Sequence, residues 1–143
     1  MDYLAAFDIS ASGMAVEKYR LDVMALNLAN ANSTRGSNGE VYQPLRVISG
    51  ARADFASHLN AYAKGQALGA EVVDVRPTNQ EPRLVFDPSH PEADAKGYVA
   101  YPNINTVSEM VTMIEATRAY EANVKAMNAA KSMALRALEI GKN

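Results

Sequence analysis

Residues 106–140 read TVSEMVTMIEATRAYEANVKAMNAAKSMALRALEI and give the strongest structural signal in the sequence, because they lie in the longest part of the chain without Gly or Pro. Asn105 or Thr106 can cap its start, and Glu109 has the capping-box spacing from Thr106. At 1.5 Å per residue we expect a helix of about 50 Å. Its coiled-coil-like seam, spaced by threes and fours, consists of Met110, Met113, Thr117, Tyr120, Val124, Met127, Lys131, Ala134 and Leu138.

The beginning of the chain, from Asp2 to about Leu28, shows the same periodicity and contains no Pro. Its seam consists of Leu4, Phe7, Ala11, Met14, Lys18, Leu21, Ala25 and Leu28. The Asn- and Ser-rich stretch from Asn30 to Gly39 ends this helix, because such residues favour left-handed turns and bond to the backbone. We expect this helix, about 40 Å long, to pair with the C-terminal one as a coiled-coil-like hairpin.

The middle of the chain is predicted to be β-rich, with all six prolines between Pro44 and Pro102. The strand candidates are Val41–Tyr42, Leu45–Ile48, Glu71–Val75, Arg83–Phe86 and Tyr98–Tyr101. Residues 51–70 show weak periodicity and are expected to form a loop or a poorly ordered excursion. The sequence thus predicts a mainly α fold with a small β-rich insert, divided into residues 1–35, 36–101 and 102–143.

Composition excludes several classes of function. Fourteen Lys and Arg against sixteen Asp and Glu leave a net charge of −2, so nucleic acid is not an expected partner. The absence of Cys excludes disulfides and Cys-ligated metals. No apolar run approaches the ~20 residues of a transmembrane helix, and the acidic start MDYLAAFD is unlike a cleaved signal peptide.

The sequence offers few candidates for chemistry. His90 lies in DPSHPEAD, residues 87–94, which could be a metal cluster or a tight surface turn, and the two prolines favour the turn. His58 has no ligand partner at a useful spacing, and Gly65-x-x-x-Gly69 lacks the Lys of a phosphate loop. We therefore expect no enzyme, cofactor, metal site or small-molecule substrate. A small metal-dependent hydrolase built on His90 is kept as the least favoured hypothesis.

Alanines outside the seams are open to two interpretations, high helix propensity alone or more than one neighbour for each helix, and the second is favoured. In a chain this small, the further neighbours are expected to be other copies or other proteins. The predicted subunit-interface residues are the bulky seam residues Leu4, Phe7, Met14, Leu21, Leu28, Met110, Met113, Tyr120, Val124, Met127 and Leu138.

Several segments carry a family resemblance. Residues 27–34, NLANANST, resemble the Asn-Leu-Ala-Asn-x-x-Thr signature of bacterial flagellar rod, hook and hook-associated proteins, with Ser33 in place of Thr. Residues 97–105, GYVAYPNIN, and 109–123 are similar to the proximal-rod members of that family. The residues that match the family motifs are Asn27, Leu28, Ala29, Asn30, Ser33, Pro102, Asn103 and Asn105.

The resemblance implies a structural role. Residues 1–35 and 102–143 would pair as helices of an inner tube, with 36–101 outside it. The subunit would assemble helically with itself and the rod proteins FlgB, FlgF, FlgG and FliE into a shaft that spans the periplasm and carries torque from the motor to the hook. It would leave the cell through the flagellar type III export apparatus without a cleaved signal. The alternative is a helix-hairpin export adaptor or chaperone that binds one partner protein.

Overall fold

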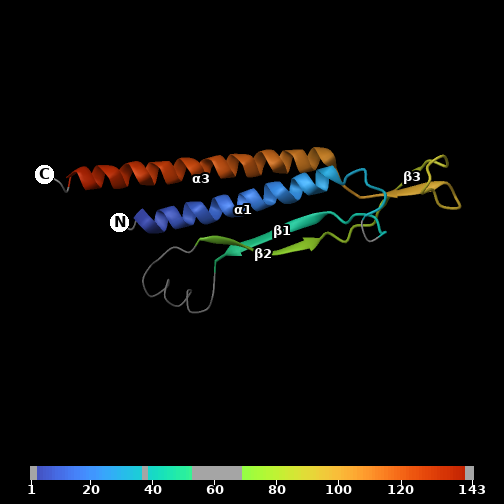
Figure 1. Ribbon diagram of the computed structural model, residues 1–143, viewed down its shortest axis with the longest axis horizontal. Coiled ribbons are helices and arrows are strands. Elements are labelled where there is room, and N and C mark those ends of the chain that lie inside the picture. The colour runs from blue at the N-terminus through green and yellow to red at the C-terminus, as the bar shows by residue number, and fades with distance from the viewer. Residues whose placement is uncertain (1–2, 37–38, 53–68, 141–143) are drawn as a thin grey trace.

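The structure is a computed structural model that describes residues 3–36, 39–52 and 69–140. Two long helices, α1 (Tyr3–Ala29) and α3 (Thr106–Ile140), lie antiparallel and side by side (Figure 1). Both helices begin and end within about a residue of the positions that their periodicity predicts. The expected fold class, a mainly α chain with paired terminal helices and a small β-rich insert, is confirmed.

The described strands form two separate antiparallel pairs. β1 (Leu45–Ala51) pairs with β2 (Ala70–Pro77), with a bulge between Ile48 and Ser49, and this pair is called the ribbon. β3 (Arg83–Phe86) pairs with β4 (Tyr98–Tyr101), and this pair is called the hairpin. The sequence predicts β3 and β4 with the same bounds.

The prediction of a strand at Val41–Tyr42 is wrong. β2 ends at Pro77, level with Leu45, so the backbone before Leu45 has no strand to pair with. One further bond, from Thr78 N to Pro44 O at 2.8 Å, closes the ribbon at that end. At its other end the ribbon extends further than predicted, to Ala51 and Ala70; the rest of the predicted loop, residues 53–68, lies outside the described residues.

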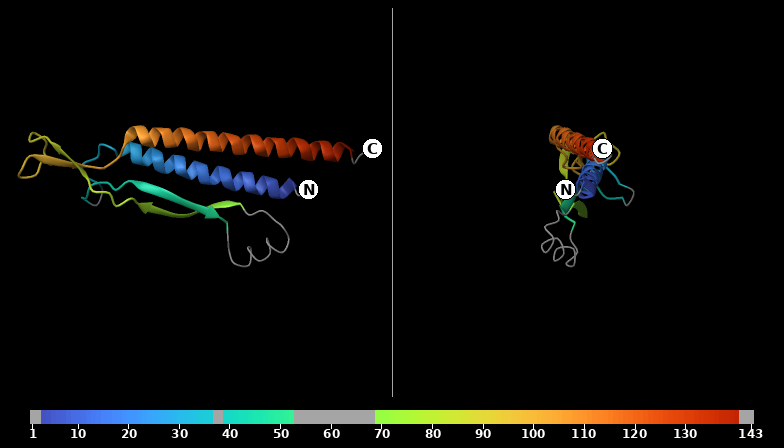
Figure 2. Two further views of the ribbon diagram at one scale, coloured as in Figure 1. Left: turned by 180° about the vertical axis from the view of Figure 1, so that it is seen from behind. Right: turned by 90° about the vertical axis from the view of Figure 1, so that its left-hand side faces the viewer.

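α1 is the central layer of the molecule. It contacts α3 along one side and the ribbon along the other, whereas the hairpin projects past the end of the helix pair (Figure 2). Because α1 packs against α3 on one face and against the ribbon on another, its buried side chains are spread over two faces. They therefore do not form one broad apolar stripe. The buried apolar residues of the described chain are Val16, Val23, Met24, Ala31, Val99, Ala116 and Ala130.

The Asn-rich stretch ends α1 as predicted. The backbone N–H of Asn30 donates to Leu26 O at 3.1 Å, and its side-chain Nδ2 donates to the same carbonyl at 2.9 Å. Ser33 N then donates to Asn30 O at 3.0 Å and turns the chain away from the helix axis. The side chain of Asn30 thus satisfies a carbonyl that a helix end leaves without a partner.

At the start of α3, the cap is Asn105. Its Oδ1 accepts from the backbone N–H of Val107 and of Ser108, both at 3.1 Å. The expected capping box between Thr106 and Glu109 is not formed, because the carboxylate of Glu109 points into the protein instead. Neither helix, over its described residues, is apolar enough to cross a bilayer.

Candidate functional site

The contact between α1 and α3 follows a line one residue away from the predicted seam. The buried residues of α3 are Glu109, Ala116 and Ala130, each next to a seam position that carries a larger side chain. Small side chains at the contact let the two helix backbones approach closely, which bulky seam residues would prevent. Bulky side chains of α3 are therefore left at the edge of the contact or outside it.

Some of the predicted interface residues lie at the edges of the contacts within the chain, and others lie on the exposed surface. Half-buried at the edges of the contacts are Phe7, Met14, Leu21, Leu28, Met113, Val124 and Met127. Exposed are Met110, Tyr120 and Leu138. The side chain of Leu4 lies outside the described part of the chain. Contact with other subunits is not tested by this placement, and the interface role of these residues stays a prediction.

At Gly13, the side chain of Asn123 from α3 lies directly against the backbone of α1. A Cβ at this position would lie 2.9 Å from Nδ2 and 3.1 Å from Cγ of Asn123. The only residue that weakens the helical pattern of α1 is therefore placed where a side chain would meet the partner helix. This explains a glycine in the middle of a long helix.

Asn27, the first residue of the NLAN motif, joins three elements. It is fully buried, and its amide uses its full hydrogen-bonding capacity. Nδ2 donates to Leu45 O at 2.9 Å and to Glu109 Oε2 at 3.2 Å. Oδ1 accepts from Leu45 N and from the Tyr42 hydroxyl, both at 2.9 Å. One side chain therefore ties α1 to the start of β1, to the segment before it and to α3.

Glu109 is the second member of this cluster and is only 2% exposed. Its Oε1 forms an ion pair with Arg46 of β1, whose side chain is half-exposed, while its Oε2 accepts from Asn27. A buried carboxylate without such partners would cost several kcal/mol. Glu109 is thus fixed by β1 and α1 together, and we call Asn27, Tyr42, Arg46 and Glu109 the polar clamp.

The clamp perturbs the hydroxyl of Tyr42. Burial, and after it the negative charge of Glu109, raises the pKa of this tyrosine above its ordinary value of 10.0. The hydroxyl therefore remains a donor to Asn27 Oδ1 at neutral and moderately alkaline pH.

Two further polar contacts hold the ribbon against α1. Ser12 Oγ accepts from the backbone N–H of Ala70 at 3.0 Å, and a Cβ on Gly69 would collide with that hydroxyl. Arg20 pairs with Glu17 and also donates from Nη2 to Ser49 Oγ at 2.7 Å. Together with the clamp, these contacts attach the ribbon along the length of α1 and fix its register.

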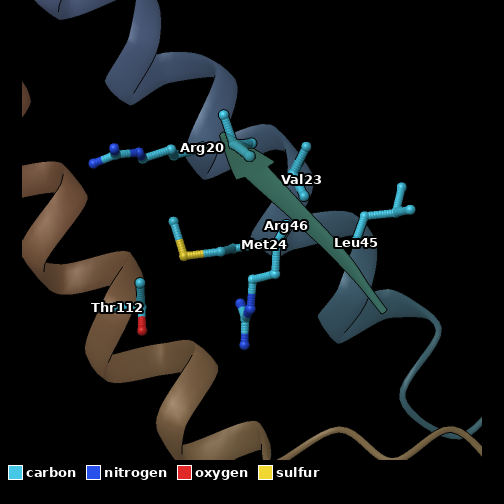
Figure 3. Close-up of a pocket in the computed structure, with 7 residues that line it drawn as sticks. Arg20, Val23, Met24, Leu45, Arg46 and Thr112 are labelled. Atoms are coloured by element: carbon cyan, nitrogen blue, oxygen red, sulfur yellow. The ribbon is translucent and has the colours of Figure 1, made fainter. Parts of the chain in front are cut away.

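A groove of about 150 Å³ lies next to the clamp, where α1, α3 and β1 meet (Figure 3). Its lining is aliphatic, with Arg20 and Arg46 as its charged members, and consists of Arg20, Val23, Met24, Leu45, Arg46, Val47 and Thr112. Neither a carboxylate nor an imidazole belongs to this lining, so these residues offer no pair for acid–base chemistry.

The remaining motif residues have structural positions. Leu28 is half-buried and Ala29 is exposed, while the Ser33 hydroxyl lies 3.3 Å from Oδ1 of Asn30, to which it donates. Pro102 is fully buried and Asn103 is exposed. The motif residues thus include a fully buried side chain, Asn27, which links α1 to β1 and α3, and the residues that end α1 and begin α3.

His90 lies in a tight turn, as its prolines predict. His90 N donates to Asp87 O at 3.2 Å, and Glu92 N donates to the His90 Nδ1 at 3.1 Å, which occupies that ring nitrogen. Among the described residues no three His, Cys, Asp or Glu side chains are grouped to hold a metal ion. His58 and Gly65 lie outside the described residues.

Comparison with known proteins gives the class of the chain. A family model described as "Flagellar basal body rod FlgEFG protein C-terminal" matches residues 95–140, which include β4 and all of α3. The paired terminal helices and this match define a structural protein of the bacterial flagellar rod.

Full-length relatives narrow the class to one family. The chain is 40% identical over 141 residues to the flagellar basal-body rod protein FlgC of Escherichia coli O6:H1, covering 99% of both chains. It is 40% identical to FlgC of Bacillus subtilis, covering 96% of this chain and 97% of the relative. Identity to FlgC of Borreliella burgdorferi is 34%, with 98% of each chain covered.

The chain belongs to the flagellar basal-body rod protein FlgC family. It is a structural subunit of the rod of the flagellar basal body, and its role in motility follows from that place. An export adaptor or chaperone is not favoured by these relatives.

Proposed function

We propose that this chain assembles helically into the proximal rod, the part of the drive shaft that carries torque from the motor towards the hook. The observation that carries the proposal is the outer face of α3. Near the start of the helix, where the clamp fixes α3 to the rest of the chain, four large apolar side chains point away from it: Val107, Met110, Val111 and Ile114, all at least half exposed.

These four residues follow helical spacing, so they form one continuous apolar surface. Among the described elements only α1 packs along α3, and β1 reaches α3 only near its start, where Arg46 pairs with Glu109. In a rod, such a surface is covered by neighbouring subunits, and a rigid helix pair suits the transmission of torque. The stiff internal ties and the apolar exterior are both properties of a building block.

The partners in this proposal are other copies of the chain and the rod proteins FlgB, FlgF, FlgG and FliE. The flagellar type III export apparatus would carry the chain out without a cleaved signal, and the rod would span the periplasm. Residues 1–35 and 102–143 would form the inner tube, with 36–101 outside it. We propose no catalytic activity and no cofactor, since the polar side chains of the clamp are occupied with each other.

The outer face of α3 is tested by placing a carboxylate on it. Met110→Asp and Ile114→Asp should leave the purified chain folded, because both side chains are exposed, but should abolish swimming by removing the chain from basal bodies. Lys125→Asp is the matched control, since it puts the same group at an exposed polar position of the same helix. Normal swimming and normal rod content of both Asp variants would refute the proposed surface.

A further inference from the structure

We propose that the facing surfaces of α1 and α3 carry a register lock, which selects one lengthwise alignment of the two helices among several that their sequence repeats allow. The lock consists of two contacts, Asn27 with Glu109 and Gly13 with Asn123. It concerns contacts within one chain, so it goes beyond the proposed rod function and is independent of it.

The surfaces that α1 and α3 turn to each other repeat every seven residues. On α3 the contact line consists of Glu109, Ala116, Asn123 and Ala130, followed by the exposed Ala137. On α1 the residues at the same spacing are Ala6, Gly13, Arg20 and Asn27. A seven-residue repeat keeps the same side of each helix facing its partner, so a slip of seven residues brings similar surfaces together again. Periodicity alone therefore does not determine how far along α1 the helix α3 lies.

The two contacts of the lock agree on one alignment. Nδ2 of Asn27 donates to Oε2 of Glu109 at 3.2 Å, and a Cβ on Gly13 would lie 2.9 Å from Nδ2 of Asn123. The chain advances by fourteen positions from Gly13 to Asn27 and again from Glu109 to Asn123, which is two repeats or about 21 Å of helix. Because the helices run antiparallel, both contacts form together in this alignment (Figure 1).

The alanines of the contact line carry no information about the alignment. Ala116 lies level with Arg20, whose guanidinium reaches away to Ser49 of the ribbon, and Ala130 lies level with Ala6. Ala116 and Ala130 are 4% and 3% exposed, so the helices are in contact at both levels. A methyl group fits against any of the facing residues of α1, so the polar residues and the glycine must decide the alignment.

A slip of one repeat in either direction breaks both contacts of the lock. It moves Glu109 about 10 Å away from Asn27, so a buried carboxylate and a buried amide each lose a partner. The same slip places Asn123 level with Arg20 or with Ala6, and neither leaves the space that Gly13 leaves. A polar residue that is satisfied in one alignment only is a device that fixes the register of coiled coils, at some cost in stability.

The connection from β4 to α3 is the other feature that could determine the alignment. It consists of residues 102–105, and its first residue, Pro102, is fully buried. A short connection anchored in this way would hold the start of α3 in place whatever side chains face α1. The two explanations differ for a chain that has lost the lock but keeps the natural connection.

The test therefore removes the lock from α3 alone. The lock-free chain carries Glu109→Ala and Asn123→Ala, which leaves alanine at every seventh position of the contact line, while Asn27 keeps its three other hydrogen bonds. The matched control carries Glu115→Ala and Asn128→Ala, because these are the same two replacements at exposed positions of the same helix.

The alignment is measured as the distance between spin labels on Asp22→Cys and Lys131→Cys in the purified full-length chain, by double electron–electron resonance. Both positions are exposed, and the chain has no Cys of its own. Asp22 is level with residue 114, seventeen positions before Lys131, or about 25 Å along the pair. We expect one distance without the lock changes and in the control, and a second distance in the lock-free chain that differs by about 10 Å, one slip of seven residues. One and the same distance in all three chains would overturn the lock and assign the alignment to the connection.

A moved lock keeps the test decisive where the lock-free chain loses its helices by circular dichroism. Glu109→Ala, Ala116→Glu, Asn123→Ala and Ala130→Asn together shift both polar residues of α3 by one repeat, and the label distance should become about 10 Å shorter. A folded chain with the moved lock and the natural distance would overturn the proposal. Loss of helices in both variants would overturn it too, because these residues would then hold the pair together rather than align it. So would a broad spread of distances without any lock change, because no alignment would then be selected.

Discussion

The amide of Asn27 should be the most sensitive polar group of the fold. Asn27→Ala removes four hydrogen bonds at once and leaves Leu45 N, Leu45 O and Glu109 Oε2 without this partner in a buried place. Each unsatisfied buried group costs about 1–3 kcal/mol, and part of this is recovered where Tyr42 turns its hydroxyl to water. We expect a loss of about 3–5 kcal/mol in the free energy of unfolding, a large part of what such a domain has.

The measurement is urea unfolding of the purified chain, followed by circular dichroism at a helical band. Asn32→Ala is the control, because Asn32 is exposed just after the same helix, and it should change stability by no more than about 0.5 kcal/mol. Asn30→Ala should fall between the two, since it removes two side-chain bonds at the helix end, the one to Leu26 O and the one from the Ser33 hydroxyl. If Asn27→Ala were as stable as the Asn32 variant, the polar clamp would not hold the fold together.

Three further predictions address other contacts. Arg46→Ala should destabilise the chain by about 2–3 kcal/mol because it leaves the buried Glu109 carboxylate without its ion pair, and adding Glu109→Gln should restore part of that loss in the same unfolding assay. Gly13→Leu should lower the free energy of unfolding by about 1–3 kcal/mol, because the new side chain overpacks against Asn123. Adding Asn123→Ala should restore part of this stability in a thermal melt. Equal loss of stability with and without Asn123→Ala would contradict the contact. The pKa of Tyr42 is raised in the folded chain, so the unfolded chain releases this proton at lower pH, and the free energy of unfolding should fall as pH rises above about 10. In Tyr42→Phe the free energy of unfolding should fall less steeply between pH 9 and 11. The same slope in both chains would refute this role of Tyr42.

The sequence predicts the elements of this fold well because most of their signals are local. The absence of Gly and Pro over residues 106–140 and the Asn-rich stop after Ala29 determine both helices. β3 and β4 are short apolar runs between turn residues, which is the ordinary signal of a strand.

The contact line between the helices could not be predicted from apolar periodicity. Periodicity finds the bulkiest stripe of a helix, whereas α1 packs against the neighbouring stripe that contains Ala116 and Ala130. The bulky stripe of α3 is left half-buried at the edge of this contact or exposed, while the ribbon packs on another side of α1. That arrangement depends on contacts between residues far apart in the sequence.

The polar clamp was only partly visible in the sequence. Asn27 is noticed as a motif residue, but Tyr42 and Arg46 are not, and Glu109 is noticed only for a capping box that does not form. Two signals could have pointed to them: Arg46 interrupts an apolar strand, and Glu109 is the only acidic residue in the first turn of α3. The hydrogen bond between Asn27 and Glu109 joins residues 82 positions apart in the chain, and no local sequence pattern predicts such a contact.

A map of the basal body at a resolution that separates helices would show directly whether this chain is a building block of the rod. We expect the α1–α3 pair with its attached ribbon to fit the wall of the proximal rod, with Val107, Met110, Val111 and Ile114 against neighbouring subunits. A complete rod wall in which no density fits this helix pair would contradict it.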